Sequence, residues 1–584
     1  MMPDQIEYSK NNGCHRRTKL EKILICSFPI FIILTLLCLV GIAMRKSCKQ
    51  EEVAEECRTS HCVKAAAELL EYIDLNKDPC TDFYKFVCGT YRKNAVKTDS
   101  TSPWASTGVL FRNELKSLVV DPISRKDTSA HVALKKFYRE CMNETKIDFN
   151  ENAAFMKAID SLGGWPLIRT SWNASNFKWD DWYIQAKQLG LPLIGFFTFQ
   201  KKQTETNGPL LAISGPRLSS MHSQYHFLKL MKKLTAVFDV TYSEQDNIEV
   251  HNFITKLEEY KNVMDFDDTD EDSSVISNIQ NLTTICPNVT WLKILNGLSG
   301  SYKFSNSSMI SFNIDKMEKY CSMLEKLLQN TTSKVIANYY VWTIIENAHL
   351  FMDKYIRRAY EDVTYDKPDR FEFCYNIAKS RFKHVVEAVY IRRKINRHVK
   401  PQILEMIEIL KELYAEHLQN SSWMDEETKS TAIKKAKAID HLIGSIDEVY
   451  DVEKFDKILG VDKFKFTSDI MFQMLQQKLT RELHHFFETL YVPSDDWDTL
   501  FRNTMKVNAY FVMPLNLMII PAPILTSIFY NRKFPAFMNY GAIGRTISHE
   551  FMHGFSKSSR LVIGSRGKFV NWWTDETTDN YDKT

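Results

Sequence analysis

The sequence has little excess of charge of either sign. Its 584 residues carry 75 Lys and Arg against 72 Asp and Glu, which leaves a formal net charge of +3. A chain this close to neutral lacks the basic footprint of a nucleic-acid binder, so we expect no nucleic-acid partner. Internal repeats and long low-complexity linkers are also absent. The apolar content of 44% is enough for a large core, in more than one domain.

Calcium-binding loops are also missing. The acidic run at 265–272 offers many carboxylates, but it has neither the glycine nor the closing glutamate of an EF-hand loop. We therefore expect a solvated surface loop there.

One motif stands out among the residues that are present. The run His549-Glu550-Phe551-Met552-His553 has the HExxH pattern. Residues four apart share a helix face, so His549 and His553 can hold one zinc ion. Glu550 then stands beside the metal, where it can act as a general base on water. The alternative is a core helix whose two histidines are satisfied by hydrogen bonds.

The third protein ligand of a catalytic zinc site is not evident. A histidine six residues after His553 would complete one common pattern, but that position is Ser559, and no histidine follows His553. Glu576 and Asp579 lie downstream without a recognisable ligand spacing. We expect that the chain lacks its third ligand.

The segment at 23–44 carries no charge and is long enough to cross a bilayer as a helix. Basic residues flank it on both sides, with a mild bias that favours a cytoplasmic N-terminus. A cleaved signal peptide is the competing interpretation, but the apolar run is long for one and no clear cleavage site follows. We expect an uncleaved signal anchor, and hence a single-pass type II protein of the plasma membrane with an extracellular ectodomain.

Sequons and cysteines agree with an extracellular location. Seven Asn-x-Ser/Thr sequons follow the anchor and are candidate glycosylation sites: Asn143, Asn173, Asn281, Asn288, Asn306, Asn330 and Asn420. Nine cysteines also follow it, and in an oxidising compartment they are typical of disulfide partners. Because nine is odd, at least one lacks an intrachain partner. Cys48, near the membrane, could bridge two chains in a homodimer.

Hydrophobic periodicity predicts a mainly helical chain with small β-sheets. Helical spacing is clear at 63–75, 111–118, 400–418 and 428–443. Strand signals are fewer and gather in two places, 193–199 and 507–520. The adjacent histidines at 484–485 point in different directions on a helix, which makes them a poor metal pair.

Several short motifs occur in one order along the chain. They are Cys57-x4-Cys62, Asp78-Pro79-Cys80-Thr81-Asp82-Phe83-Tyr84, Cys88-Gly89, Gly163-Gly164-Trp165-Pro166, Pro216-Arg217-Leu218, Trp423-Met424-Asp425-x2-Thr428, Val507-Asn508-Ala509-Tyr510, Pro521-Ala522-x-Ile524-Leu525, Asn539-Tyr540-Gly541 and Asn571-Trp572-Trp573. Together with HExxH, they make residues 57 to 584 resemble the neprilysin and endothelin-converting-enzyme family of membrane zinc endopeptidases.

The resemblance implies two largely helical lobes around a central cavity, with a thermolysin-like catalytic lobe that is incomplete in this chain. It divides the chain into a cytoplasmic tail (1–22), an anchor (23–44), a stalk (45–56), a largely helical N-terminal peptidase region (57–500) and a partial catalytic domain (501–584). The implied substrates are oligopeptides, cut on the amino side of hydrophobic residues.

The resemblance also implies roles for individual residues. Asn508 and Ala509 would lie on an edge strand that pairs with the substrate backbone. Taken alone, Asn508 is equally well an ordinary strand-end residue. Disulfide bonds are implied for Cys57 with Cys62 and for Cys141 with Cys374. Cys286 and Cys321 could pair with each other, and the partners of Cys80 and Cys88 would lie beyond Thr584.

Three departures bear on activity. The family takes its third zinc ligand from a Glu-x3-Asp segment, which would fall beyond Thr584. Two carboxylates that usually follow the second histidine are replaced by Ser556 and Lys557. Arg545 replaces an apolar residue one turn before His549, and its charge would oppose zinc binding if it shares the histidine face.

We therefore expect a type II zinc metalloendopeptidase that binds one Zn²⁺, and that is inactive or nearly so as the chain stands. One alternative is a non-catalytic relative that binds peptides or proteins through the central cavity that the resemblance implies. Another is an incomplete fragment that does not fold stably, because orphaned cysteines and exposed core surface favour aggregation.

Overall fold

A computed structural model describes residues 59–94, 102–168, 172–204, 208–218, 223–264, 275–300, 302–395, 397–461, 464–490, 504–526, 529–556, 559, 562–563, 568–569 and 571–583. The expected tail, anchor and stalk (1–56), Cys57, the acidic run at 265–272 and Lys557 lie outside these residues. Across the described part, no helix is both long and apolar enough to span a bilayer.

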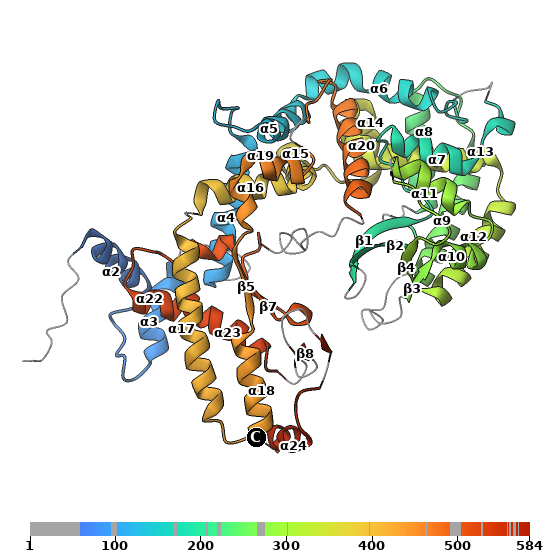
Figure 1. Cartoon of the computed structure of the whole chain (residues 1–584). Coiled ribbons are helices and arrows are strands. Elements are labelled where there is room, and N and C mark those ends of the chain that lie inside the picture. The colour runs from blue at the N-terminus through green and yellow to red at the C-terminus, as the bar shows by residue number, and fades with distance from the viewer. Residues whose placement is uncertain are drawn as a thin grey trace, which may run out of the picture. The chain divides into compact units, whose positions relative to one another are not determined.

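The described part of the chain is mainly helical with three small sheets, which confirms the predicted fold class (Figure 1). In chain order the elements are α2 (Ser60–Tyr72), α3 (Phe83–Asn94), α4 (Pro103–Val120), α5 (Ser129–Met142), α6 (Glu144–Asp160), η1 (Ala174–Asn176), α7 (Trp179–Gln188), β1 (Thr198–Thr204), β2 (Gly208–Ser214), α8 (Gln224–Val237), α9 (Glu244–Met264), β3 (Val275–Asn278), α10 (Ile279–Ile285), α11 (Trp291–Ser299), β4 (Met309–Phe312), α12 (Ile314–Gln329), α13 (Ser333–Ala348), η3 (His349–Phe351), α14 (Lys354–Thr364), α15 (Arg370–Arg381), α16 (Lys383–Lys394), α17 (Val399–Gln419), α18 (Glu426–Lys437), β5 (Asp440–Gly444), η4 (Asp447–Tyr450), α19 (Val452–Ile458), α20 (Met471–Thr489), β6 (Tyr510–Val512), η5 (Met513–Leu515), β7 (Leu517–Pro521), η6 (Ala522–Leu525), α22 (Ala536–Asn539), η7 (Tyr540–Gly544), α23 (Arg545–His553), β8 (Val562–Ile563), β9 (Lys568–Phe569) and α24 (Asp575–Lys583).

Contacts divide the chain into two compact units. Among the described residues, the smaller comprises 59–93 and 533–535, and the larger comprises the rest. In the smaller unit Asp74 forms an ion pair with Lys93 at 2.8 Å. Gly89 lies so close to Asp74 that a Cβ there would come within 2.7 Å of the Asp74 Cβ, which accounts for a glycine in this motif. Cys80 and Cys88 are free thiols.

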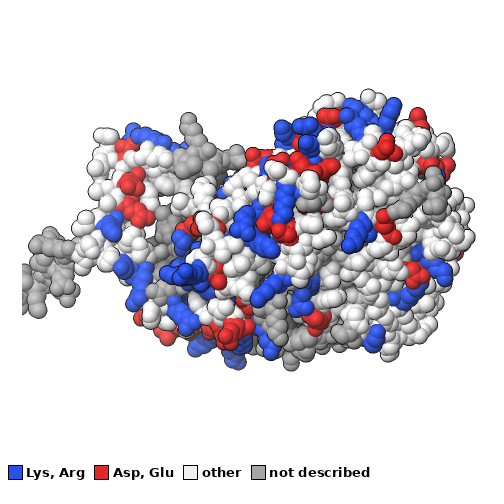
Figure 2. Space-filling model, turned by 90° about the horizontal axis from the view of Figure 1, so that it is seen from above, with Lys and Arg blue, Asp and Glu red and all other residues white. Residues whose placement is uncertain are grey.

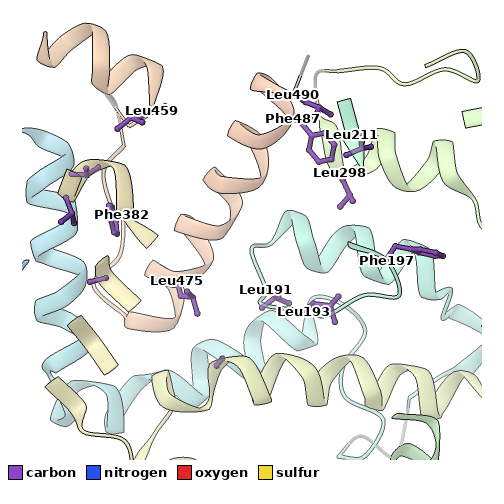
Figure 3. Packing of buried hydrophobic residues seen from close by; sticks show 14 of the residues in the cluster. Leu191, Leu193, Phe197, Leu211, Leu298, Phe382, Leu459, Leu475, Phe487 and Leu490 are labelled. Atoms are coloured by element: carbon purple, nitrogen blue, oxygen red, sulfur yellow. The ribbon is translucent and has the colours of Figure 1, made fainter. Parts of the chain in front are cut away.

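The larger unit has an extensive apolar core. Helix α13 is buried over most of its surface, and twelve of its residues are buried. Figure 3 shows another part of this core, where α20 contributes Leu475 and Phe487 and the segment after α7 contributes Leu191 and Leu193. Burial of large apolar side chains such as these stabilises the fold by about 1.5–3 kcal/mol each.

Two disulfide bonds hold distant segments of the larger unit together. Cys141 is bonded to Cys374, and Cys286 is bonded to Cys321, as the family resemblance implies. Cys62 is also disulfide-bonded. Lys and Arg side chains are interspersed with Asp and Glu on the face shown in Figure 2, in keeping with the small net charge.

Two predicted elements need correction. The expected helix at 428–443 ends at Lys437, because the residues that follow form β5, which pairs in parallel with β7. The expected strand at 193–199 is largely irregular chain, and β1 starts only at Thr198. Leu193, Phe196 and Phe197 of that segment are buried without pairing in a strand ladder. The expected domain boundaries stay a prediction.

Candidate active site

The HExxH motif lies on α23, which continues from α22 through a π-helical turn at Tyr540–Gly544. Ile547 and Phe551 point into the core and are almost fully buried, whereas His549 and His553 are exposed on another face. π-Helical turns inside α-helices are frequent at functional sites. The amphipathic period of the helix therefore presents both imidazoles together.

Contacts with neighbouring segments hold α22 and the end of α23 in place. The Asn539 side chain accepts a hydrogen bond from the Asn531 N–H at 3.1 Å and donates one to the Asn531 carbonyl at 3.0 Å. Beyond His553, a Cβ on Gly554 would lie 3.0 Å from the Phe511 ring. The glycine thus lets β6 pack closely against the end of α23.

The two histidines face one another. Their Nε2 atoms lie 3.1 Å apart, and the two rings are nearly perpendicular at 88°. Two nitrogens bound tetrahedrally to one zinc ion at about 2.0–2.1 Å would be about 3.3 Å apart, so the pair fits this metal. With Glu550, their potential ligand atoms all lie within 4.8 Å of one another, and no other group of three His, Cys, Asp or Glu does so in the described part of the chain.

Glu550 is only 4% exposed. This burial raises the pKa of its carboxyl group from 4.5 to about 7. A carboxylate with a pKa near neutrality takes up a proton readily at physiological pH, which suits a general base. Glu550 lines the same cavity as the two histidines.

An edge strand borders this cavity. The sheet has the order β5-β7-β6, so β6 has a neighbour on one side only. The central strand, β7, is completely buried. Asn508 and Ala509 directly precede β6; Asn508 is exposed and Ala509 is buried. Their proposed role in binding a substrate backbone stays a prediction, but their position suits it.

The Tyr510 side chain connects this strand with the HExxH helix. Burial raises the pKa of its hydroxyl group and the negative charge of Glu550 raises it further, whereas a hydrogen bond with the Asn508 side chain lowers it. Asn508, Tyr510 and Glu550 are therefore close enough to interact.

The cavity has a volume of about 480 Å³. Its lining comprises Trp104, Asn508, Ala509, Tyr510, Phe511, Met513, Arg545, Thr546, His549, Glu550, His553 and Ser556. Sequence reasoning missed Trp104, which comes from the start of α4 and packs on Phe529 with ring centroids 4.3 Å apart. No local pattern marks this residue, because it reaches the site only through tertiary folding.

The altered residues around the motif take definite places. Arg545 lines the cavity with His549, so it does share the histidine side of the helix. Ser556 also lines it, and its hydroxyl group donates to the His553 carbonyl at 3.3 Å. Ser559 is fully buried and its hydroxyl group donates to the same carbonyl. It therefore caps the helix end.

The two acidic residues downstream of HExxH that could have been zinc ligands do not cluster with the histidines. Glu576 and Asp579 are exposed on α24 and are not among the clustered groups described above.

Two of the short motifs contact each other. Trp423 and Trp573 pack with ring centroids 5.5 Å apart, and both contact Tyr581. A further link supports the chain after HExxH, where Lys435 donates a hydrogen bond to the Ser559 carbonyl at 3.0 Å. Burial lowers the pKa of Lys435 to about 8. These contacts tie α18 and α24 to the catalytic segment.

Curated relatives match over most of this chain. Neprilysin-11 of Caenorhabditis elegans is 25% identical over 578 residues, which cover 92% of this chain and 66% of the relative. Rat endothelin-converting enzyme 1 is also 25% identical, over 97% of this chain and 76% of the relative. The chain thus spans about two thirds to three quarters of the length of these relatives.

Solved structures match in fold. The Mycobacterium tuberculosis zinc metalloprotease Zmp1 in its open state superposes with a TM-score of 0.70 and 15% identity, over 87% of this chain and 79% of that one. PepO from Lactobacillus superposes with a TM-score of 0.58 and 16% identity, over 87% of this chain and 80% of that one.

Two regions that together make up about three quarters of the chain match the models of a single family. Residues 79–445 match the N-terminal region, and residues 508–584 match the second region, of "Peptidase family M13". The second match contains the paired histidines, Glu550 and the edge strand. The chain belongs to peptidase family M13.

Proposed function

We propose that this protein is a zinc-dependent endopeptidase that hydrolyses oligopeptides. The main support for this proposal is that three features lie at one cavity. These are two imidazoles spaced for one metal ion, a buried carboxyl group beside them, and the free edge of β6. Neprilysin and endothelin-converting enzyme among its relatives support the same activity.

The residues divide the work as follows. His549 and His553 would hold the zinc ion, which when bound polarises a carbonyl group and activates water. Glu550 accepts the proton of the attacking water at its carboxylate oxygen and can return it to the leaving amine. The edge of β6 and the Asn508 amide hold the peptide backbone in extended form.

The lining of the cavity supports the proposed substrate preference. Trp104, Phe511 and Met513 offer apolar surface beside the two histidines. This supports cleavage on the amino side of hydrophobic residues, the specificity carried over from the family resemblance.

Two imidazoles are fewer than the three protein ligands that catalytic zinc sites have. The described residues offer Glu550 as the one further group near the pair, and the family resemblance assigns the third ligand to a Glu-x3-Asp segment. We propose that such a segment is required for tight binding of one Zn²⁺ and for turnover.

An extracellular site of action is part of the proposal, with a single membrane-spanning helix at 23–44. Two observations support it. Two disulfide bonds indicate an oxidising compartment. Six of the seven sequon asparagines are exposed, and Asn281 is half-buried. A homodimer through Cys48 stays a prediction.

A second function, peptide binding without turnover, is favoured by one observation. Arg545 places a positive charge on the cavity wall one turn from His549. This charge opposes a divalent cation and thus weakens the case for catalysis.

One experiment separates the two functions. The protein, purified in a form that includes the Glu-x3-Asp segment, is supplied with zinc, and cleavage of a short peptide with an internal hydrophobic residue is followed by mass spectrometry. Zinc-dependent cleavage that is lost in Glu550→Gln supports the peptidase. Peptide binding that a chelator leaves unchanged, with no cleavage, supports the binding protein.

A further inference from the structure

Arg545 is the only Lys or Arg among the described residues that line the active-site cavity. It occupies the first position of α23, four residues before His549 and eight before His553. Residues spaced by four lie on one face of a helix, so the guanidinium group and both imidazoles point to the same side. The positive charge of Arg545 therefore lies on the cavity wall that a bound substrate would contact.

Among the described residues, no carboxylate forms an ion pair with the Arg545 guanidinium group. Arg545 is exposed and makes no ion pair or hydrogen bond with any side chain in the described part of the chain. Other arginines in this protein are paired, for example Arg357 with Glu144 at 3.0 Å and Arg381 with Glu482 at 2.9 Å. The bidentate donor of Arg545 is thus available to a ligand.

Helix geometry sets the reach of this group. Four residues of α-helix advance by about 6 Å, whereas an extended peptide advances by about 3.4 Å per residue. One helical turn, the separation of Arg545 from the metal pair along α23, therefore equals the length of about two residues of an extended peptide. A guanidinium group binds a carboxylate through two parallel hydrogen bonds, which an amide cannot match.

We propose that Arg545 selects peptides that carry a carboxylate about two residues from the scissile bond. This inference rests on the proposed function, since it assigns the substrate class of the same cavity. The preferred peptide combines a hydrophobic residue, which packs on the Trp104 and Phe511 surface, with a nearby carboxylate. That carboxylate is either an Asp or Glu side chain or the free C-terminus of a short peptide.

The test is a binding measurement, which does not depend on turnover. The full chain, purified in mild detergent and treated with chelator, is titrated into fluorescein-labelled oligopeptides, and anisotropy is recorded. One peptide pair differs only by Glu or Gln two residues from a Phe. A second pair, both carrying Gln, differs only by a free or an amidated C-terminus two residues from the Phe.

We expect the carboxylate member of at least one pair to bind about tenfold to a hundredfold more tightly than its neutral partner, the range for a hydrogen bond to a charged group. The pair that shows the difference identifies the source of the carboxylate. Arg545→Met should remove this preference and leave binding of the neutral peptides unchanged. Arg545→Glu should reverse it in favour of a Lys-containing peptide.

A matched control is Arg532→Met. Arg532 is also exposed and lies before the same helical segment, but it does not line the cavity. This variant should keep the full preference. Unchanged binding of the neutral peptides shows that each variant is folded.

Two results would overturn the inference: equal binding of the charged and neutral members in both pairs, or a preference that survives in Arg545→Met. The proposed function fails separately. A carboxylate preference without cleavage after addition of zinc leaves the inference standing and removes the peptidase. Zinc-dependent cleavage at the same rate with and without the carboxylate would support the peptidase and contradict the role of Arg545.

Discussion

Asp425 and Thr577 hold each other through a reciprocal contact. The Thr577 hydroxyl group donates to the Asp425 carboxylate, and the Asp425 N–H donates back to the same hydroxyl oxygen at 3.1 Å. Thr574 and Thr428 donate to the same carboxylate, which also caps the start of α18. One side chain thus joins α18 to the chain that follows the HExxH helix.

We expect Asp425→Ala to destabilise the attachment of α24 by about 2–4 kcal/mol, because it removes a helix cap and several charge-assisted hydrogen bonds. Partial burial acts to raise the Asp425 pKa, but the hydrogen bonds from Thr574, Thr577 and Thr428 outweigh it and lower the pKa below 3.8. This contribution is therefore complete above pH 4 and is lost as the pH falls through the lowered pKa. Limited proteolysis at neutral pH, with cleavage sites mapped by mass spectrometry, measures the change.

The matched control is Asp425→Asn, which keeps an acceptor oxygen but not the charge. It should protect α24 better than Asp425→Ala does. Equal cleavage of the wild type and Asp425→Ala would show that the packing of Trp423 against Trp573 alone holds this segment.

Burial of Glu550 should appear as a pH-dependent cost to stability. Its pKa is about 7 in the folded protein against an ordinary value of 4.5, so the folded state favours the neutral carboxyl group. The stability contributed by this group is complete below about pH 4.5 and is lost as the pH rises through about 7. A shift of this size corresponds to at most about 3 kcal/mol.

Glu550→Gln in the metal-free protein should therefore raise the free energy of unfolding at pH 8 and leave it nearly unchanged at pH 4. Urea denaturation followed by tryptophan fluorescence at the two pH values gives the comparison. A gain of the same size at both pH values would mean that charge burial is not its cause. The same variant should abolish peptide hydrolysis.

The paired imidazoles predict a metal affinity that depends on both. Loss of a group that merely orients a ligand weakens metal binding by about tenfold to a hundredfold, and loss of a ligand costs more. We expect His549→Ala and His553→Ala each to weaken zinc binding by more than about a hundredfold. Competition with a chromophoric chelator measures the affinity.

His484→Ala supplies the control for this series, because His484 is exposed on α20, outside the candidate site. It should leave zinc affinity unchanged. Equal zinc affinities of the His484→Ala and His549→Ala variants would contradict a metal site at His549 and His553.

Local sequence predicted the helix of the site but not its surroundings. The four-residue spacing of His549 and His553 was sufficient, because a helix face is a local property. Trp104 could not be found in this way, since it contacts the cavity only after α4 has packed near η6. The buried environment of Glu550, and hence its pKa near 7, is likewise a product of tertiary packing.

The same division holds for the fold. The helix at 400–418 was predicted almost to its ends, since α17 is a long amphipathic helix. The run at 428–443 has helix-forming residues throughout, yet its last part forms β5, because Leu442 and Ile443 pair with Ile519 and Ile520 of β7. Non-local pairing overrides local propensity there.

The Cys141–Cys374 and Cys286–Cys321 disulfide bonds should contribute unequally to stability. Cys141 and Cys374 are 233 residues apart, whereas Cys286 and Cys321 are 35 apart. The loop-closure model gives about 5 kcal/mol for the longer loop and about 4 kcal/mol for the shorter one. We expect the double variant Cys141→Ser/Cys374→Ser to lose more stability than Cys286→Ser/Cys321→Ser, by about 1–2 kcal/mol.

Each double variant replaces one disulfide bond by two buried serine hydroxyl groups. The cost of burying these hydroxyl groups is therefore common to both variants, and each variant is a control for the other. Three of the four cysteines are 2% exposed or less and Cys321 is 5% exposed, so differences in hydration are small. Urea denaturation under non-reducing conditions measures the difference. A larger loss from the Cys286–Cys321 pair would contradict the loop-length argument. It would show that this bond stabilises the native packing of α10 and α12. Cys286 directly follows α10, and Cys321 lies within α12.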